Sequence, residues 1–169
     1  MKIEETNKIL SVIYEAYPSF RKDRNPKRTS ELWHVYFKNV SYEQAAEALK
    51  IYIAMDTKGF PPAQGALLEI ISSQMKQEEM TEMEAWNLTC NAISRSTYYS
   101  CEEFNKLPPV IQKVVGSPDN LHNWAALDEW SVQNNVAPWF RRAYNSQMER
   151  ERRTKLIPQG DFLHLMQGN

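Results

Sequence analysis

Apolar residues recur every three or four positions in separate segments along most of this chain. Between Glu4 and Tyr17, five of them share one helical face: Ile9, Leu10, Ile13, Tyr14 and Tyr17. Alternation of the kind typical of strands is limited to short runs such as "VIQKVV" at residues 110–115. The spacing therefore predicts an all-α fold.

Helix-ending and capping residues divide the first half of the chain into four helices. Pro18 ends the first helix, and Thr29 or Ser30 is expected to cap the second. The sequence "SYEQ" at 41–44 fits a capping box that opens a third helix, which runs to about Met55. Amphipathic helices with short connections are typical of a bundle. The expected inward faces are Leu32, Trp33, Tyr36 and Phe37 on the second helix, and Ala45, Leu49, Tyr52 and Ile53 on the third.

The stretch "GFPP" at 59–62 separates the third helix from a fourth, expected over about residues 62–75. Glycine suits a helix end, and proline suits a first helical turn, where its missing N–H would have had no partner. We expect Phe60 to fill the core of this first bundle.

The composition changes at "KQEEMTEMEA", residues 76–85, which holds four acidic residues and little to bury. We interpret it as a short polar link between two small packed helical bundles, and its "TEME" fits a second capping box. The predicted organisation is an N-terminal helical domain over 1–76, a C-terminal helical region over 82–156 and a flexible tail over 157–169. The tail contains apolar residues, so docking on the folded chain is the alternative.

Capping residues also divide the second half. A helix is expected over residues 83–95, followed by a short turn and a helix capped by Ser100, with Glu103 in the capping-box position. Ser117 and Pro118 fit the N-cap and the first position of a further helix.

The last predicted helix, about residues 137–156, is long and carries six basic side chains against Glu149 and Glu151. Two interpretations stay open. The helix has a solvated charged face, or it extends a surface that binds a partner or phosphates. Apolar tail residues are a second candidate contact. The candidate partner-binding residues are Arg141, Arg142, Tyr144, Arg150, Arg152, Arg153, Phe162 and Leu165.

The net charge of −1 and a pI near 6.3 argue against a protein whose whole surface binds polyanions. Contact with nucleic acid would have to be local. The segment "RKDRNPKRTSE" at 21–31 contains five basic residues and no large apolar one, so we expect an exposed loop. Its candidates for phosphate contact are Arg21, Lys22, Arg24, Lys27 and Arg28.

No catalytic constellation is recognisable. The five glycines never form the phosphate-binding spacing G-x-x-x-x-G-K-[ST] that a P-loop ATPase requires. The three histidines lie far apart, and Cys90 and Cys101 occur in helical contexts that favour inert thiols. We expect no enzymatic activity, no cofactor and no bound metal. Two isolated cysteines, no signal peptide and no apolar run of about 18 residues predict a cytoplasmic protein outside the membrane.

Five tryptophans fall on predicted helices, and indole rings usually pack in cores. Trp130 and Trp139 flank the polar segment "SVQNNVAP" and are expected to be the exceptions. An exposed indole beside such a segment could anchor a protein partner.

Four stretches of the first half resemble, in their order and spacing, the replicative-helicase loader/inhibitor proteins of phages that infect Gram-positive bacteria. They are "YEAYPSF" at 14–20, "LWHVYF" at 32–37, "SYEQAAEALKIYIA" at 41–54 and "FPPAQGALLEI" at 60–70. The resemblance covers about residues 1–75. It implies a small helical domain in a non-enzymatic DNA-replication protein that acts in the cytoplasm of a bacterial host cell.

The resemblance also implies binding to the hexameric replicative DNA helicase, restraint of its activity, and its delivery to an origin-bound phage initiator. A host helicase loader is a further candidate partner. The second half departs from the family, whose best-known member has a largely disordered C-terminal portion, because residues 83–140 here have the tryptophans and caps of folded helices. The alternative hypothesis is a DNA-binding replication accessory that uses residues 21–28 and the last helix, with weak phosphate contacts.

Overall fold

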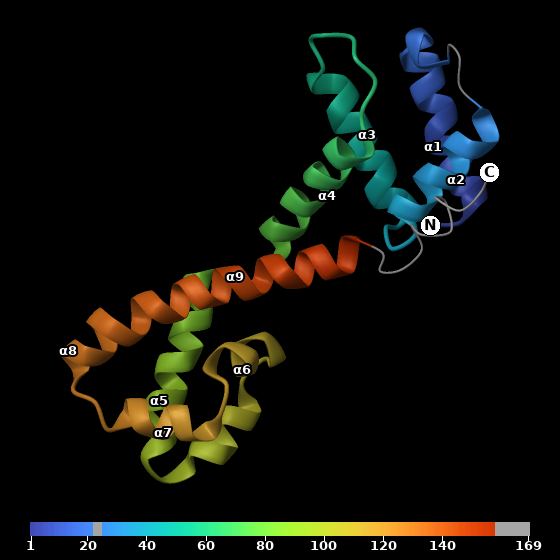
Figure 1. Ribbon diagram of the computed structural model, residues 1–169. Coiled ribbons are helices and arrows are strands. Elements are labelled where there is room, and N and C mark those ends of the chain that lie inside the picture. The colour runs from blue at the N-terminus through green and yellow to red at the C-terminus, as the bar shows by residue number, and fades with distance from the viewer. Residues whose placement is uncertain (22–24, 158–169) are drawn as a thin grey trace. The chain divides into compact units, whose positions relative to one another are not determined.

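The computed structural model describes residues 1–21 and 25–157 (Figure 1). All regular secondary structure in these two ranges is helical, which confirms the predicted all-α fold. The chain divides into two compact units, Met1–Glu78 with Arg152–Asn169 and Glu79–Glu151. We call them the first unit and the second unit and describe each by itself. Among the described helices, none is both long and apolar enough to cross a lipid bilayer.

The first unit is built mainly from the helical elements that precede residue 79, coloured blue to green in Figure 1. They are α1 (Ile3–Ala16), the 3-10 turn η1 (Pro18–Arg21), α2 (Pro26–Phe37), α3 (Tyr42–Met55) and α4 (Gln64–Glu78). Helix α1 packs against α2 and α3, and α4 packs against α3. Each helix therefore buries its apolar face against a neighbour in sequence or in the bundle.

Aromatic rings form the centre of the first unit's core. The ring of Trp33 stacks on that of Phe37, with centroids 5.5 Å apart, and meets Phe20 edge-on. The inward faces predicted for α1, α2 and α3 supply most of the remaining side chains, since their three- and four-residue spacing matches the helical turn. The buried apolar set is Ile9, Leu10, Ile13, Tyr17, Phe20, Trp33, Phe37, Val40, Ala45, Ala48, Leu49, Leu67, Ile71 and Leu156.

The cap of α3 is as predicted, and the cap of α2 is not. The backbone N–H of Gln44 donates to the hydroxyl of Ser41, and the Gln44 side chain accepts from the Ser41 N–H, both at 3.1 Å. Helix α2 begins at Pro26 and is capped by Asn25, so the prediction of Thr29 or Ser30 is wrong. Asparagine caps as well as serine does, and proline favours the first helical position, so the earlier pair starts the helix.

The connection between α3 and α4 corrects the prediction for Phe60. Oδ1 of Asp56 accepts from the N–H groups of Lys58 and Gly59, and Gly59 adopts a left-handed φ of 71°. The hydroxyl of Tyr52 donates to the carbonyl of Phe60 at 3.2 Å. The Phe60 side chain is 67% exposed, whereas Pro62 is buried. The left-handed turn thus directs the phenyl ring to solvent, and a proline ring occupies the interior position.

The second unit contains the elements coloured light green to orange in Figure 1. They are α5 (Glu82–Lys106), α6 (Pro109–Val115), α7 (Pro118–Ala125), α8 (Glu129–Ser131), the π-helical turn η2 (Val132–Val136) and most of α9 (Ala137–Leu156). Helix α7 packs along α5. The buried apolar set is Ala85, Trp86, Ala92, Ile93, Leu107, Ile111, Val114, Val115, Leu121, Val136, Ala137, Phe140 and Tyr144.

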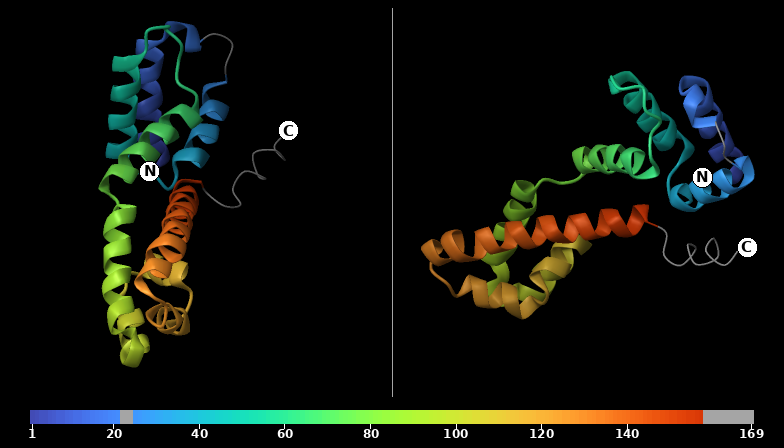
Figure 2. Two further views of the ribbon diagram at one scale, coloured as in Figure 1. Left: turned by 90° about the vertical axis from the view of Figure 1, so that its left-hand side faces the viewer. Right: turned by 45° about the horizontal axis from the view of Figure 1, so that its top comes forward.

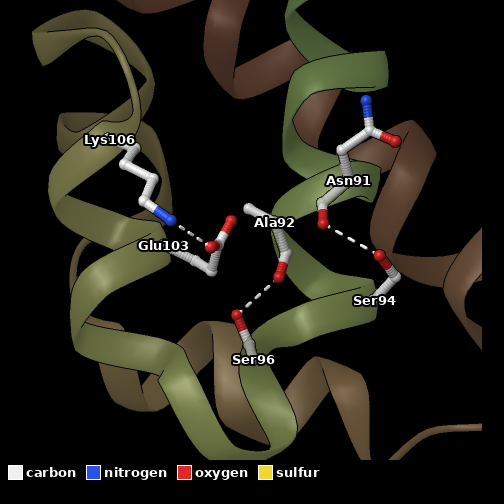
Figure 3. A network of polar contacts seen from close by, with 6 residues as sticks. All are labelled: Asn91, Ala92, Ser94, Ser96, Glu103 and Lys106. Carbon is white, nitrogen blue, oxygen red and sulfur yellow. Dashed lines mark hydrogen bonds and ion pairs between the residues drawn. The ribbon is translucent and has the colours of Figure 1, made fainter.

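Helix α5 is continuous where the sequence predicted a turn capped by Ser100. It bends instead at Tyr99, whose backbone (φ −125°, ψ 34°) is not helical. One turn earlier, the hydroxyl of buried Ser96 donates to the Ala92 carbonyl at 2.6 Å (Figure 3), a back-bond that commonly bends helices. Figure 3 also shows Glu103 paired with Lys106, so it does not complete a capping box.

The polar segment 131–138 also differs from the prediction, because it joins two helices without a loop. Asp128 caps α8, which passes through η2 into α9, and the continuous helical path is visible in both views of Figure 2 (orange to red). Helix α9 spans Ala137–Leu156, the range predicted for the last helix. The caps predicted at Thr81 and Ser117 are confirmed.

Candidate partner-binding surfaces

The basic candidates on α9 differ in exposure. Arg142, Arg150 and Arg153 are exposed, while Arg141 and Arg152 are half-buried. Arg142 and Arg150 are eight residues apart, little more than two helical turns, so they project within about 80° of each other around the α9 axis. The exposed arginines, rather than the whole set, can be reached by a large partner.

Arg141 and Tyr144 face the interior of the second unit. The Tyr144 ring is 1% exposed and stacks on Phe140, with centroids 6.1 Å apart. A guanidinium nitrogen of Arg141 lies 3.8 Å from Sδ of Met83. Burial raises the pKa of the nearby Cys90 thiol, and the charge of Arg141 partly opposes that rise. Tyr144 therefore has a packing role in this conformation.

Polar side chains of α9 bond to other helices of the second unit. Asn145 donates to the carboxylate of Glu82, and Lys113 pairs with Glu151 at 2.7 Å. Over residues 79–151 the sequence has ten acidic side chains and six basic ones. The second unit is therefore acidic as a whole, although α9 carries exposed arginines.

The predicted basic loop is partly helical. Lys27 and Arg28 are exposed in the first turn of α2, where their N–H groups already donate to Oδ1 of Asn25 at 3.1 and 3.3 Å. A phosphate at this helix start would therefore have to contact their side chains. Arg21 ends η1. The candidates Lys22, Arg24, Phe162 and Leu165 lie outside the described residues.

The tryptophans divide as the sequence predicted. Trp33 and Trp86 are buried, at 2% and 3% exposure, and Trp124 is half-buried. Trp130 is 68% exposed and Trp139 is 44% exposed. The second unit therefore presents two indole rings to solvent close to the start of α9.

A groove between α3 and α4 is a surface that the sequence did not suggest. It has a volume of about 370 Å³ and combines an apolar floor with carboxylates and amides. Glu47 on its wall pairs with Lys50 at 3.2 Å, and the backbone N–H groups at the start of α3 lower the pKa of Glu43. The lining residues are Glu43, Gln44, Glu47, Ile71, Gln74, Met75, Gln77 and Glu78. Four-residue spacing within α3 was the available signal, but the opposing helix lies more than twenty residues further along the chain.

Residues 1–68 match the family model for the N-terminal domain of the gp39 protein, the phage helicase loader/inhibitor. This part of the chain is a gp39 N-terminal domain. The match confirms the resemblance to the phage helicase loader/inhibitor family for the first half of the chain. No curated protein and no solved structure matches the chain. The gp39 domain ends within α4, so the acidic groove has one wall inside the matched region and one beyond it.

The motifs that carried the resemblance meet in the interior of the gp39 domain. The ring of Tyr17 meets that of Tyr52 edge-on at 6.5 Å, and the hydroxyl of Tyr52 bonds the Phe60 carbonyl. Burial, followed by a hydrogen bond with Asp56, raises the pKa of Tyr17 to about 12. These residues come from three of the four motifs. The motifs therefore specify the fold of the gp39 domain and identify the family, whereas the exposed surfaces described above lie mostly elsewhere.

Proposed function

We propose that the chain is a non-enzymatic phage or prophage replication accessory that binds the hexameric replicative helicase, inhibits it and/or loads it at an origin. The observation that carries this proposal is the gp39 N-terminal domain at residues 1–68. A loader of the P-loop ATPase type would need a phosphate-binding loop, and no glycine spacing in this sequence provides one. The protein acts in the bacterial cytoplasm, where a phage origin-binding initiator or a host helicase loader is a further partner.

The helicase contact uses the exposed arginines of α9, with the tail residues Phe162 and Leu165. Arg142, Arg150 and Arg153 support this choice because they are exposed and accessible to a carboxylate-bearing surface. Binding that favours one conformation of the helicase ring over another would restrain ATP hydrolysis and unwinding. Arg141, Arg152 and Tyr144 then hold or flank α9 and do not lead the contact.

The test is co-elution of the full chain with the replicative helicase of a Gram-positive host, with and without ATP. We expect a complex for the wild type and loss of at least tenfold in affinity for the triple variant Arg142→Glu, Arg150→Glu, Arg153→Glu. A triple variant with the same charge change at exposed sites, Lys58→Glu, Lys76→Glu, Arg95→Glu, is the control and should bind normally. Absence of co-elution under both conditions overturns the proposed function.

A DNA-binding accessory is the second candidate, and the exposure of Lys27 and Arg28 at the start of α2 favours it. Such binding would be local, because the second unit carries more acidic than basic side chains. Fluorescence anisotropy with single- and double-stranded oligonucleotides should then give an affinity that falls steeply with salt. The variant Lys27→Ala, Arg28→Ala should reduce the slope of that dependence by about two.

A further inference from the structure

Three large apolar side chains of the second unit are exposed where α7 passes into α8 and η2. Leu127 is 45% exposed, Trp130 68% and Trp139 44%. Together they offer on the order of 400 Å² of surface, within the range of the largest patches on monomeric proteins, which often have a function. We call these three residues the tryptophan patch.

The backbone and rings of the tryptophan patch are held in place before any partner binds. The Trp139 ring meets Trp124 edge-on, with centroids 5.8 Å apart, and the Leu127 N–H donates to the Trp124 carbonyl at 3.2 Å. The side chain of Asn134 donates to the Trp130 carbonyl at 2.8 Å. Anchored side chains lose little conformational entropy on association, so a patch of this kind binds better than its area suggests.

Opposite charges bracket the tryptophan patch along the helical path. Asp128 and Glu129 directly precede Trp130, and both are exposed. Arg142, also exposed, follows Trp139 by three residues and therefore projects from the same side of α9. The order along the axis is acidic, aromatic and then basic.

This polarity decides between occupants. A nucleic acid would place phosphates beside Asp128 and Glu129 in a unit that is acidic overall, which is unfavourable. A second copy of the same surface, turned by a two-fold axis perpendicular to the helix, runs in the opposite direction and presents its basic end to the acidic end of the first. Such isologous pairing is the commonest arrangement in soluble oligomers.

We propose that the tryptophan patch is a self-association surface, on which a second copy of this chain docks antiparallel. The indole rings of the two copies pack together at the centre, and Glu129 of each copy faces Arg142 of the other. The patch is smaller than the roughly 800 Å² per partner of a stable interface, so the dimer is weak and depends on concentration. This inference goes beyond helicase binding and does not rest on it.

Sedimentation equilibrium of the full chain, from about 2 to 200 µM, tests the proposal. We expect reversible dimerisation, and we expect Trp130→Ser to raise the dissociation constant at least tenfold. Trp130 is the best site for substitution because its ring is the most exposed of the patch. Tyr98→Ser is the matched control, since Tyr98 is 87% exposed on α5 outside the patch, and it should dimerise normally. Far-UV circular dichroism checks the fold of each variant.

Charge exchange provides a second test that does not remove apolar surface. Glu129→Arg or Arg142→Glu alone places like charges opposite each other and should weaken the dimer about threefold to tenfold. The double variant restores opposite charges and should return to within about twofold of the wild type. A chain that stays monomeric throughout, or a double variant no tighter than the singles, overturns the proposal.

Helicase co-elution separates this inference from the proposed function. Trp130→Ser should still co-elute with the helicase, because that contact is assigned to the arginines of α9. If Trp130→Ser abolishes co-elution and leaves the association state unchanged, the tryptophan patch is a helicase contact and self-association through it is excluded. If no variant and no wild-type chain binds helicase, the dimer measurement still stands on its own.

Discussion

The hydroxyl group of Tyr144 on α9 donates a hydrogen bond to the backbone carbonyl of Met80, 3.0 Å away and 64 residues earlier in the chain. Burial raises the pKa of the Tyr144 phenol, so it remains a neutral donor at physiological pH. The bond fixes α9 to the residue that precedes the Thr81 cap of α5. Two distant ends of the second unit are thereby held at one point.

Removal of the Tyr144 hydroxyl should destabilise the second unit modestly. We expect Tyr144→Phe to lower the free energy of unfolding by about 1 kcal/mol, since the ring packing is kept and one hydrogen bond is lost. Tyr144→Ala should cost about 3 to 5 kcal/mol, because a cavity replaces a buried ring. Urea denaturation followed by tryptophan fluorescence is a suitable measurement, since four of the five tryptophans lie in the second unit. Tyr98→Phe, on an exposed ring, should change stability by less than about 0.5 kcal/mol.

The same chemical change should have opposite effects at two glycines of the first unit. Gly59 has a φ of 71°, and no atom lies within 4 Å of an added Cβ, so Gly59→Ala introduces backbone strain alone and should cost about 1 kcal/mol. Gly65 lies at the start of α4 with equally open space, so Gly65→Ala should stabilise by about 0.5 kcal/mol. Hydrogen exchange in peptides from α3 and α4 reports both effects. Destabilisation by both variants would contradict this explanation.

Asp56 should make the first unit sensitive to acid. The Lys58 N–H, and then the hydroxyl of Tyr17 and further N–H groups, hold the pKa of Asp56 below its usual value of 3.8. A lowered pKa in the folded state means that this stabilisation is present above about pH 4 and is lost as the pH falls through the folded-state pKa. Asp56→Asn should therefore lose less hydrogen-exchange protection in α3 than the wild type between about pH 4 and pH 2. Parallel pH curves for the two proteins would show that Asp56 is not the group responsible.

Tyr17 should respond at the opposite end of the pH scale. Its pKa is raised to about 12, mainly by burial and then by the hydrogen bond with Asp56. The stabilisation is present below the ordinary phenol pKa of about 10 and is lost as the pH rises towards 12. The difference between tyrosinate absorbance titrations of the wild type and Tyr17→Phe should be a single ionisation near pH 12. A difference centred near pH 10 would mean that Tyr17 is exposed in solution.

Local chemistry explains which parts of the fold could be predicted from the sequence. The caps at Ser41, Thr81 and Ser117 depend on residues within three positions of each other, so the sequence pattern contains the whole interaction. The start of α2 was misplaced because Asn25, Thr29 and Ser30 are all competent caps, and a local pattern does not rank them. The class and the core faces followed from periodicity alone.

Tertiary contacts explain what could not be predicted. The bend of α5 depends on the burial of Ser96, whose carbonyl also lies 3.3 Å from Nδ1 of His122 on α7. Phe60 was expected inside because it is large and apolar, but its position depends on the bond between its carbonyl and Tyr52. The acidic groove needs α3 and α4 together. The basic character of α9 was evident from the sequence, whereas the burial of Tyr144 and the half-burial of Arg141 came only from packing.

The π-helical turn η2 has a consequence for how the second unit tolerates insertions and deletions. A π turn holds about one residue more than an α turn, so loss of a single residue from 132–136 would convert it to ordinary α-helix without breaking the chain path. Each residue turns an α-helix by about 100°, so every side chain of α9 would rotate relative to Trp130 by roughly a quarter of a turn. Phe140 and Tyr144 would leave the core and the arginines would face a new direction. One residue in this turn therefore acts as an angular spacer that keeps the two ends of the helix in phase.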